Sequence, residues 1–235
     1  MSSEKNVAGK FYDVWILVPC FNEAKVISKT ITGLSRYFKN ILVVDDGSTD
    51  NTFDLLKQTN ALVLKHPINL GQGAAISSGI KFLSTQENCK AVITFDADGQ
   101  HSVDDAVTFA KEILYSSKDV IFGSRFIYHE KNIPLLKRFV LKIVTKVSNI
   151  ILKMNLTDTH NGLKAFKSDS LKNIDIQTSN YAFESELLAL VSKSDLTYKE
   201  LPSNIVYTEY SRKKGQSLRN GMRILESLIV LFFSR

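Results

Sequence analysis

The sequence has few cysteines and no long apolar run, and both absences exclude classes of protein to which it could belong. Its only cysteines, Cys20 and Cys89, lack the close spacing of metal-binding pairs, so we expect reduced, structural thiols in a cytosolic protein. No stretch reaches the roughly 18 apolar residues of a membrane-spanning helix. The polar start MSSEKNVAGK is not followed by the apolar segment of a secretory signal. The 235 residues suffice for a sizeable core in one large or two small domains.

Acidic residues are missing from one region of the chain. Residues 1–125 carry 13 basic and 14 acidic residues, residues 126–235 carry 17 and 10, and residues 131–156 contain no acidic residue. A basic second half indicates an anionic partner, with solubilising surface lysines as the alternative. Nucleic acid is a poor candidate, because the basic residues lie on apolar faces without stacking aromatic residues between them.

Strand and helix patterns alternate through the first half. Five apolar runs predict buried strands, at 14–20, 41–46, 61–66, 90–96 and 119–125. Four intervening segments have apolar residues at helical spacing, at 23–38, 49–59, 71–84 and 102–116. We expect Ser48 or Thr49 to cap the second helix. This alternation predicts an α/β fold with a mostly parallel sheet and helices on both faces.

Acidic and amide side chains follow three of these strands. Asn22-Glu23, Asp45-Asp46 and Asp96-Ala97-Asp98 each come directly after an apolar run. Ligands bind to such sheets at the carboxyl ends of the strands, so we expect the three clusters to share one edge. Carboxylates held this close repel each other unless a cation or polar hydroxyl groups offset their charge.

Residues 133–154 break the alternation with a basic amphipathic helix. Arg138, Lys142, Lys146, Asn149 and Lys153 fall on one face of this helix, and the rest is almost wholly apolar. The pattern predicts a helix that lies in a membrane interface, with core packing behind a solvated basic stripe as the alternative. The apolar C-terminus is either a second interfacial helix or the start of a longer hydrophobic segment.

Five motifs resemble those of family 2 glycosyltransferases with the GT-A fold. VPCFNE, VVDDGSTDNT, NLGQGAAISSGI, FDADGQH and FGSRF occur in the family's order, and the resemblance covers roughly residues 13–215. The sequence is most similar to the polyprenyl-phosphate sugar transferases, typified by dolichol-phosphate mannose synthase. The segment NLGQG is neither a P-loop, since Gly-Lys-Ser/Thr is missing, nor the G-x-G-x-x-G dinucleotide fingerprint.

The resemblance implies a nucleotide-sugar site with a divalent metal ion. Mg²⁺ or Mn²⁺ would be held by Asp96, Asp98 and the amide oxygen of Gln100, and would neutralise the leaving diphosphate. His101 would lie near the substrate or open the following helix, and it is not counted as a ligand. Asp98, Arg125 and Arg138 are the expected catalytic residues. The expected substrate-binding residues are Pro19, Asn22, Glu23, Asp45, Asp46, Gly71, Gln72, Asp96, Ala97, Arg212, Lys214 and Ser217.

The acceptor distinguishes two hypotheses. A lipid phosphate is already an anion and needs cations to hold it, which by resemblance are Arg125 and Arg138. A hydroxyl on a lipid-linked glycan or polysaccharide needs a carboxylate base, for which Glu184 and Glu186 are candidates. The segment 158–167 matches the family's acceptor-side motif only in part, and the basic loop 210–217 resembles the one that closes over the diphosphate.

We therefore predict a metal-dependent, inverting glycosyltransferase at the inner, cytoplasmic face of a membrane, active in cell-envelope glycan biosynthesis. It would move one sugar from a nucleoside diphosphate, UDP favoured over GDP, to dolichyl or undecaprenyl phosphate. The expected parts of one catalytic domain are a nucleotide-sugar half (1–126), an acceptor half (127–217) and an apolar end (218–235). A homo-oligomer or a membrane-protein partner is possible, and a non-catalytic sugar-nucleotide sensor is the alternative of another class.

Overall fold

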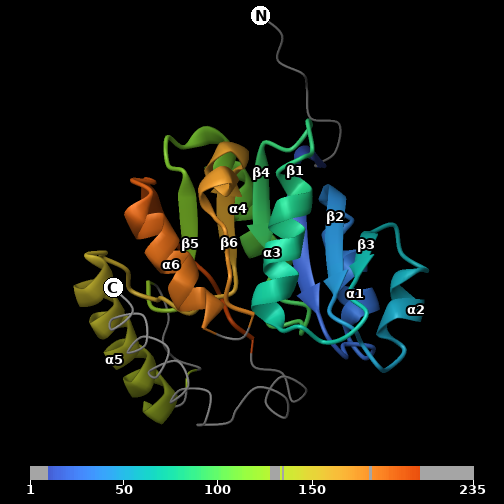
Figure 1. The fold of residues 1–235 in the computed structure, drawn as a ribbon, viewed down its shortest axis with the longest axis horizontal. Coiled ribbons are helices and arrows are strands. Elements are labelled where there is room, and N and C mark those ends of the chain that lie inside the picture. Colours follow the sequence, from blue (N-terminus) through green and yellow to red (C-terminus); the bar gives the residue numbers. More distant parts are fainter. Residues whose placement is uncertain (1–9, 128–132, 134, 180–181, 207–235) are drawn as a thin grey trace, which may run out of the picture.

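The computed structural model describes residues 10–127, 133, 135–179 and 182–206. Its centre is a seven-stranded sheet with helices on both faces (Figure 1). In spatial order the strands are β3 (Leu62–Lys65), β2 (Phe38–Asp45), β1 (Phe11–Cys20), β4 (Ala91–Thr94), β6 (Lys164–Lys167), β5 (Val120–Ser124) and β7 (Tyr198–Pro202). All neighbouring pairs are parallel except those of β6, which runs antiparallel to both β4 and β5. The sheet is thus mostly parallel, as predicted.

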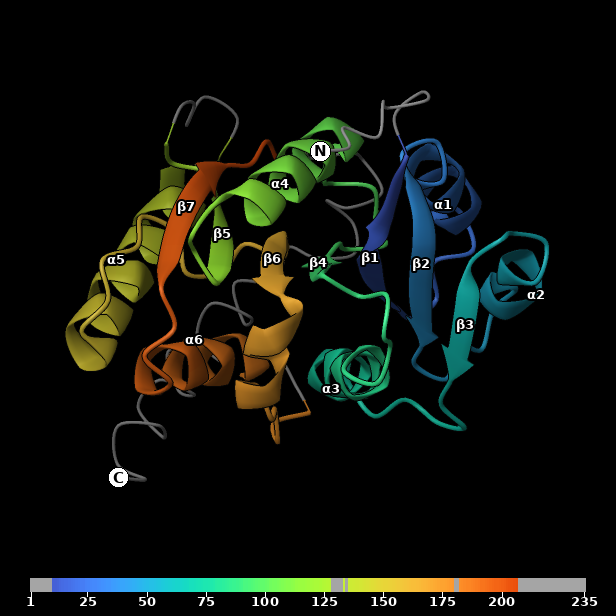
Figure 2. The same ribbon diagram turned by 90° about the horizontal axis from the view of Figure 1, so that it is seen from above.

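Helices cover both faces of the sheet (Figure 2). The described helices are α1 (Ile27–Leu34), α2 (Thr52–Leu56), α3 (Gln72–Leu83), α4 (Val103–Tyr115), α5 (Leu135–Leu152), the 3₁₀ helix η1 (Ser168–Asn173) and α6 (Phe183–Lys193). Side chains of α1 and α4 pack with one face of β1, where Ile16 and Val18 point, and those of α3 and α6 pack with the other, where Leu17 points. This alternation follows from the two-residue period of a strand.

Most predicted elements are present, with two corrections. Helix α1 is much shorter than the predicted 23–38: residues 24–26 form a turn before it, and residues 35–37 turn into β2, which begins at Phe38. The prediction that Ser48 or Thr49 caps the second helix is wrong: the N-cap of α2 is Asn51, and the Ser48 hydroxyl accepts from the backbone N–H of Asn22 (2.9 Å). Strands β6 and β7 are additions that the sequence pattern did not predict.

Candidate active site

The carboxyl ends of β2, β1 and β4 lie side by side and carry the three polar clusters. Parallel pairing places Asp45 opposite Cys20, and Leu17 opposite Thr94 two residues before Asp96. The backbone N–H of Asp46 donates to the carbonyl of Cys20 (2.8 Å), which closes the gap between two of the clusters. The predicted gathering of acidic residues along one edge of the sheet is confirmed.

Asp96 and Asp98 stand on the turn after β4. The backbone N–H of Gln100 donates to Asp98 Oδ1 (3.0 Å), and Gly99 supplies a positive φ of 73° that tightens the turn. Burial, followed by the negative charge of Asp96, raises the pKa of Asp98 above its ordinary value. The Gln100 amide nitrogen faces Asp98 Oδ2, so the predicted role of its oxygen as a metal ligand would require the amide to turn over.

His101 and Gly162 enclose the carboxylate of Asp96. The buried ring of His101 places Nε2 3.1 Å from Asp96 Oδ2, and the Gln72 amide donates to Asp96 Oδ1 (3.3 Å). Burial works to raise the pKa of Asp96, but the hydrogen bond to His101 and the positive charges around the carboxylate, Lys164 and Arg125 among them, together hold that pKa below its ordinary value. A Cβ on Gly162 would overlap Asp96 Oδ2, so only glycine leaves room for this side chain.

These residues fit a divalent cation that is shared with a substrate. A cation between Asp96 and Asp98 would remove the repulsion that contributes to the raised pKa of Asp98. Within residues 10–206, as far as the structure describes them, no three His, Cys, Asp or Glu side chains surround one point. Mg²⁺ commonly takes only one or two carboxylates and completes its shell with water and substrate phosphates. Two carboxylates beside an open edge suit that arrangement.

The paired aspartates after β2 differ in their surroundings. Asp45 Oδ1 accepts from the backbone N–H of Ser48 (3.0 Å), while its buried Oδ2 has no hydrogen-bond partner in the described part of the chain. Asp46 accepts through both oxygens, from the backbone N–H groups of Leu70 (2.9 Å) and Gly71 (2.7 Å) and from His66 Nδ1 (2.7 Å). Asp45 therefore keeps one buried carboxylate oxygen unengaged by the described residues, whereas both oxygens of Asp46 are engaged.

The remaining predicted donor residues line the same edge. Asn22 has a φ of 55° and its side-chain oxygen accepts from the backbone N–H of Thr49 (2.8 Å), so it joins the loop after β1 to the turn after β2. Glu23 is buried and its backbone N–H donates to Thr52 Oγ1 (2.8 Å). Pro19 and Ala97 are buried in the edge itself. Arg212, Lys214 and Ser217 lie outside the described residues.

Across β4, a buried ion pair organises the predicted acceptor side. Arg125, directly after β5, donates through Nε and Nη2 to the two oxygens of Asp158 (2.6 and 2.7 Å) and through Nη2 to the carbonyl of His160 (2.6 Å). Burial works to raise the pKa of Asp158, but Arg125 outweighs it and the pKa is lowered. Burial lowers the pKa of His160 to about 4, so its ring is neutral at physiological pH.

A second buried ion pair joins β6 to α6. Lys164 Nζ is 2.6 Å from Glu184 Oε2 and donates to the carbonyl of Asn161 (2.5 Å), and only 3% of the lysine side chain is exposed. Burial raises the pKa of Glu184 even though Lys164 is adjacent. Glu186 instead accepts from the backbone N–H groups of Gln177 (2.9 Å) and Thr178 (2.7 Å), so it holds the loop before α6.

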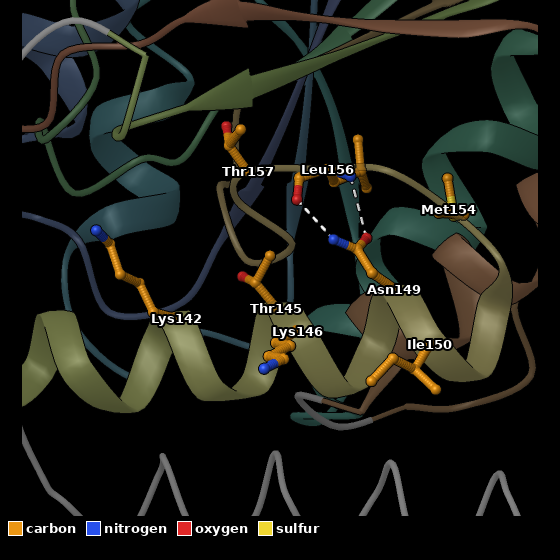
Figure 3. Close-up of a pocket in the computed structure, with 8 residues that line it drawn as sticks. All are labelled: Lys142, Thr145, Lys146, Asn149, Ile150, Met154, Leu156 and Thr157. Carbon is orange, nitrogen blue, oxygen red and sulfur yellow. Dashed lines mark hydrogen bonds between the residues drawn. The ribbon is translucent and has the colours of Figure 1, made fainter.

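A groove runs between α5 and residues 154–157 (Figure 3). It encloses about 490 Å³. The residues that line it are Lys142, Thr145, Lys146, Asn149, Ile150, Met154, Leu156 and Thr157. Asn149 pairs with the backbone N–H (3.0 Å) and carbonyl (2.7 Å) of Leu156, which fixes the far wall against the helix. Arg138 lies half-buried near the start of α5.

A hydrogen-bonded chain connects this groove to the Arg125 pair. The hydroxyl groups of Thr145 and Thr159 are 3.2 Å apart, and Thr159 Oγ1 is 2.9 Å from His160 Nδ1. Sequence reasoning missed Asp158, Gly162 and Lys164. The only signal for them was the partial motif 158–167, whose charged residues have partners that no short-range pattern reveals.

A mostly parallel sheet with paired carboxylates at its carboxyl edge places the candidate ligand site of this α/β protein at that edge. The family model for glycosyl transferase family 2 matches residues 15–175, and the chain belongs to this family. It is a glycosyltransferase, as predicted.

The chain aligns with individual relatives over most of their length. It is 30% identical to the UDP-N-acetylglucosamine–dolichyl-phosphate N-acetylglucosaminyltransferase of Methanococcus voltae, over 93% of this chain and 95% of that protein. It is 25% identical to the undecaprenyl-phosphate mannosyltransferase of Micrococcus luteus, over 92% and 91%. The fold matches glucosyl-3-phosphoglycerate synthase from Mycobacterium tuberculosis, solved with Mn²⁺, UDP and phosphoglyceric acid, with a TM-score of 0.69 and 14% identity over 93% of this chain and 78% of that one. This likeness confirms the predicted GT-A fold.

Proposed function

We propose that the protein transfers one sugar from a nucleoside diphosphate to a polyprenyl phosphate, with inversion and with a divalent cation on Asp96 and Asp98. The observation that carries the acceptor assignment is the Lys164–Glu184 ion pair, which engages one of the two carboxylates that were candidates for a base. The relatives named above, which act on dolichyl and undecaprenyl phosphate, support the same acceptor class.

The donor assignment rests on the edge formed by β2, β1 and β4. Asp45 offers a buried carboxylate oxygen to a base N–H or a ribose hydroxyl. UDP is favoured over GDP because a named relative uses a UDP-sugar and a structural neighbour was solved with UDP and Mn²⁺. When bound at Asp96 and Asp98, Mg²⁺ or Mn²⁺ supplies positive charge to the departing diphosphate.

A phosphate acceptor suits the charges on the other side of the sheet. If Glu184 accepted a proton from a sugar hydroxyl, it would leave the buried ammonium of Lys164 without its counter-ion, which is costly. Both oxygens of Glu186 are engaged by backbone N–H groups. A phosphate monoester needs no base, and these two carboxylates therefore favour it over the glycan-extending alternative.

In the proposed reaction an oxygen of the lipid phosphate attacks the anomeric carbon from the face opposite the diphosphate. The new C–O bond forms as the bond to the β-phosphate oxygen breaks, and the bond electrons leave with the nucleoside diphosphate. Arg125 and Arg138 hold the attacking phosphate, and Asp158 fixes the plane of the Arg125 guanidinium. His101 and Gln72 hold Asp96 in place.

We also propose that α5 lies on the inner membrane surface. Its exposed stripe alternates lysines with large apolar residues, a combination suited to an interface of anionic headgroups and acyl chains. The stripe consists of Phe139, Lys142, Ile143, Lys146, Ile150 and Lys153. Among the described residues, none of the helices combines the length and apolar character needed to cross a membrane.

The test is a transfer assay with Mn²⁺, radiolabelled UDP- and GDP-sugars, and undecaprenyl or dolichyl phosphate in detergent. We expect label to enter an acid-labile lipid. The Arg138→Ala variant should impair acceptor use and leave nucleotide affinity nearly intact, with Arg36→Ala, an exposed arginine just before the amino end of β2, as the matched control. Donor binding without lipid labelling would instead favour a glycan acceptor.

A further inference from the structure

A histidine outside the predicted site forms a hydrogen-bonded chain with Asp46 and Ser78. His66 follows β3, and its backbone N–H donates to the carbonyl of Asp45 (2.9 Å). Its Nδ1 is 2.7 Å from Asp46 Oδ1 and its Nε2 is 3.0 Å from the hydroxyl of Ser78 on α3. Only 12% of the histidine side chain and 4% of the Asp46 side chain are exposed.

The order Ser-His-Asp is that of a hydrolytic triad, but the local structure serves another purpose. Ser78 lies in the middle of α3, and the carboxylate of Asp46 does more than orient the imidazole. It also accepts the backbone N–H groups of Leu70 and Gly71. Because an ionised carboxylate only accepts, His66 donates to Asp46 from Nδ1, and Nε2 forms the second hydrogen bond with the hydroxyl of Ser78.

This chain determines where α3 begins. Gly71, at the N-cap of α3, has a φ of 100°, and the next residue, Gln72, donates to Asp96 Oδ1 (3.3 Å). Gly47, with a φ of 71°, lies so close to the same loop that a Cβ would overlap the backbone of Ile68 and Asn69. The loop 66–71 is thus pressed onto the end of β2 and held there by one carboxylate.

We infer that His66 is a positioning residue for the donor nucleotide: with Ser78 it fixes Asp46, which holds the Leu70–Gly71 turn and places Gln72 against Asp96. The inference rests on the proposed function for its catalytic readout. It assigns the two aspartates after β2 different tasks. Asp46 holds the loop, whereas one oxygen of Asp45 is not engaged by the described residues.

Two substitutions separate the two ends of the imidazole. In His66→Asn the amide nitrogen lies near the position of Nδ1 and can still donate to Asp46. In His66→Gln the longer side chain places its amide near Nε2, where it reaches Ser78 but not Asp46. We expect His66→Gln to raise the KM for the nucleotide sugar about tenfold, which corresponds to one charge-assisted hydrogen bond, with kcat and the acceptor KM nearly unchanged. His66→Asn should retain most of the donor affinity.

Neighbouring serines provide a matched control. Ser78→Ala removes the distal bond and should raise the donor KM a few-fold. Ser77→Ala, whose hydroxyl donates instead to the carbonyl of Ile176 (3.0 Å), should leave it unchanged. A core-packing role for His66 would predict equal losses in His66→Asn and His66→Gln and a parallel fall in stability, which would overturn the inference.

Hydrogen exchange tests the inference independently of the reaction. The backbone amides of Leu70 and Gly71 should exchange faster in His66→Gln than in the wild type, and at nearly wild-type rates in His66→Asn. Equal exchange in all three proteins would overturn the positioning role. If the exchange rates change as expected but the wild type binds neither UDP nor GDP with Mn²⁺, the proposed function fails and the loop assignment stands.

Discussion

The two sides of the site hold their charges in different ways. On the donor side, carboxylates are bound largely by backbone N–H groups in tight loops, as Asp45 is by Ser48 and Asp98 is by Gln100. On the acceptor side, buried side chains pair with each other across long stretches of sequence, as Arg125 does with Asp158. The first arrangement leaves carboxylate oxygens without a charged partner, whereas in the second each buried charge has an opposite charge beside it, and Asp158 also orients Arg125.

The largest effect should come from a carboxylate that the fold does not need. Asp98→Asn removes one of the proposed cation ligands, and we expect kcat/KM to fall at least about 10³-fold. The free energy of unfolding should stay equal or rise, because the repulsion from Asp96 disappears. Transfer assays and urea unfolding measure the two quantities. Retained activity would show that Asp98 is not a ligand.

Replacing Asp158 should, in contrast to Asp98, lower the free energy of unfolding. Asp158→Asn leaves the buried guanidinium of Arg125 without its counter-ion, and we expect a loss of about 3–5 kcal/mol in unfolding free energy. The folded-state pKa of Asp158 is lowered, so its contribution to stability is complete at neutral pH and is lost as pH falls through that pKa, below 3.8. Urea unfolding at several pH values should therefore show a weaker acid dependence in the variant. An unchanged acid limb would contradict this account.

This contrast explains what the sequence could predict. The strand-end clusters were predictable because strands that run parallel in one sheet have their carboxyl ends at the same edge. The Arg125–Asp158 and Lys164–Glu184 pairs were not, since β6 enters antiparallel between β4 and β5 and brings distant segments together. Glu184 and Glu186 look alike as candidate bases in sequence. Only the fold shows that one meets a buried lysine and the other meets backbone amides.

Glu184→Gln tests whether the carboxylate of Glu184 stabilises the fold or acts as a catalytic base. If Glu184 serves as the counter-ion of Lys164, Glu184→Gln should lower the free energy of unfolding by about 3 kcal/mol. The loss of kcat should then be modest. A catalytic base would give the reverse, a fall of about 10²–10⁴ in kcat with little change in stability. Denaturation and transfer assays on the same preparation distinguish these results, and Glu186→Gln, which alters the backbone-bonded neighbour, is the control.

The exposed lysines of α5 should have a smaller effect, and only in the presence of lipid. Replacing Lys142 and Lys146 by Gln removes about 1 kcal/mol each of attraction to anionic headgroups, or roughly 30-fold in binding to such vesicles. Sedimentation with vesicles that contain phosphatidylglycerol measures this binding. Lys25→Gln with Lys29→Gln, exposed lysines on the donor side, should not change it. Equal losses in both double variants would argue against α5 as the membrane surface.

The smallest effect should come from the cap of α4, a contact within a single helix terminus. The Ser102 hydroxyl accepts from the backbone N–H of Asp104 (3.2 Å), so Ser102→Ala should cost about 1 kcal/mol in unfolding free energy. Activity should be unaffected, because the cap acts only on its own helix. Ser102 follows His101, which holds Asp96, and a loss of activity at unchanged stability would show that the start of α4 also positions that histidine. Ser102 would then act on the active site as well as on its own helix. Helix caps would join backbone loops and ion pairs as a third way in which this site holds its charged groups.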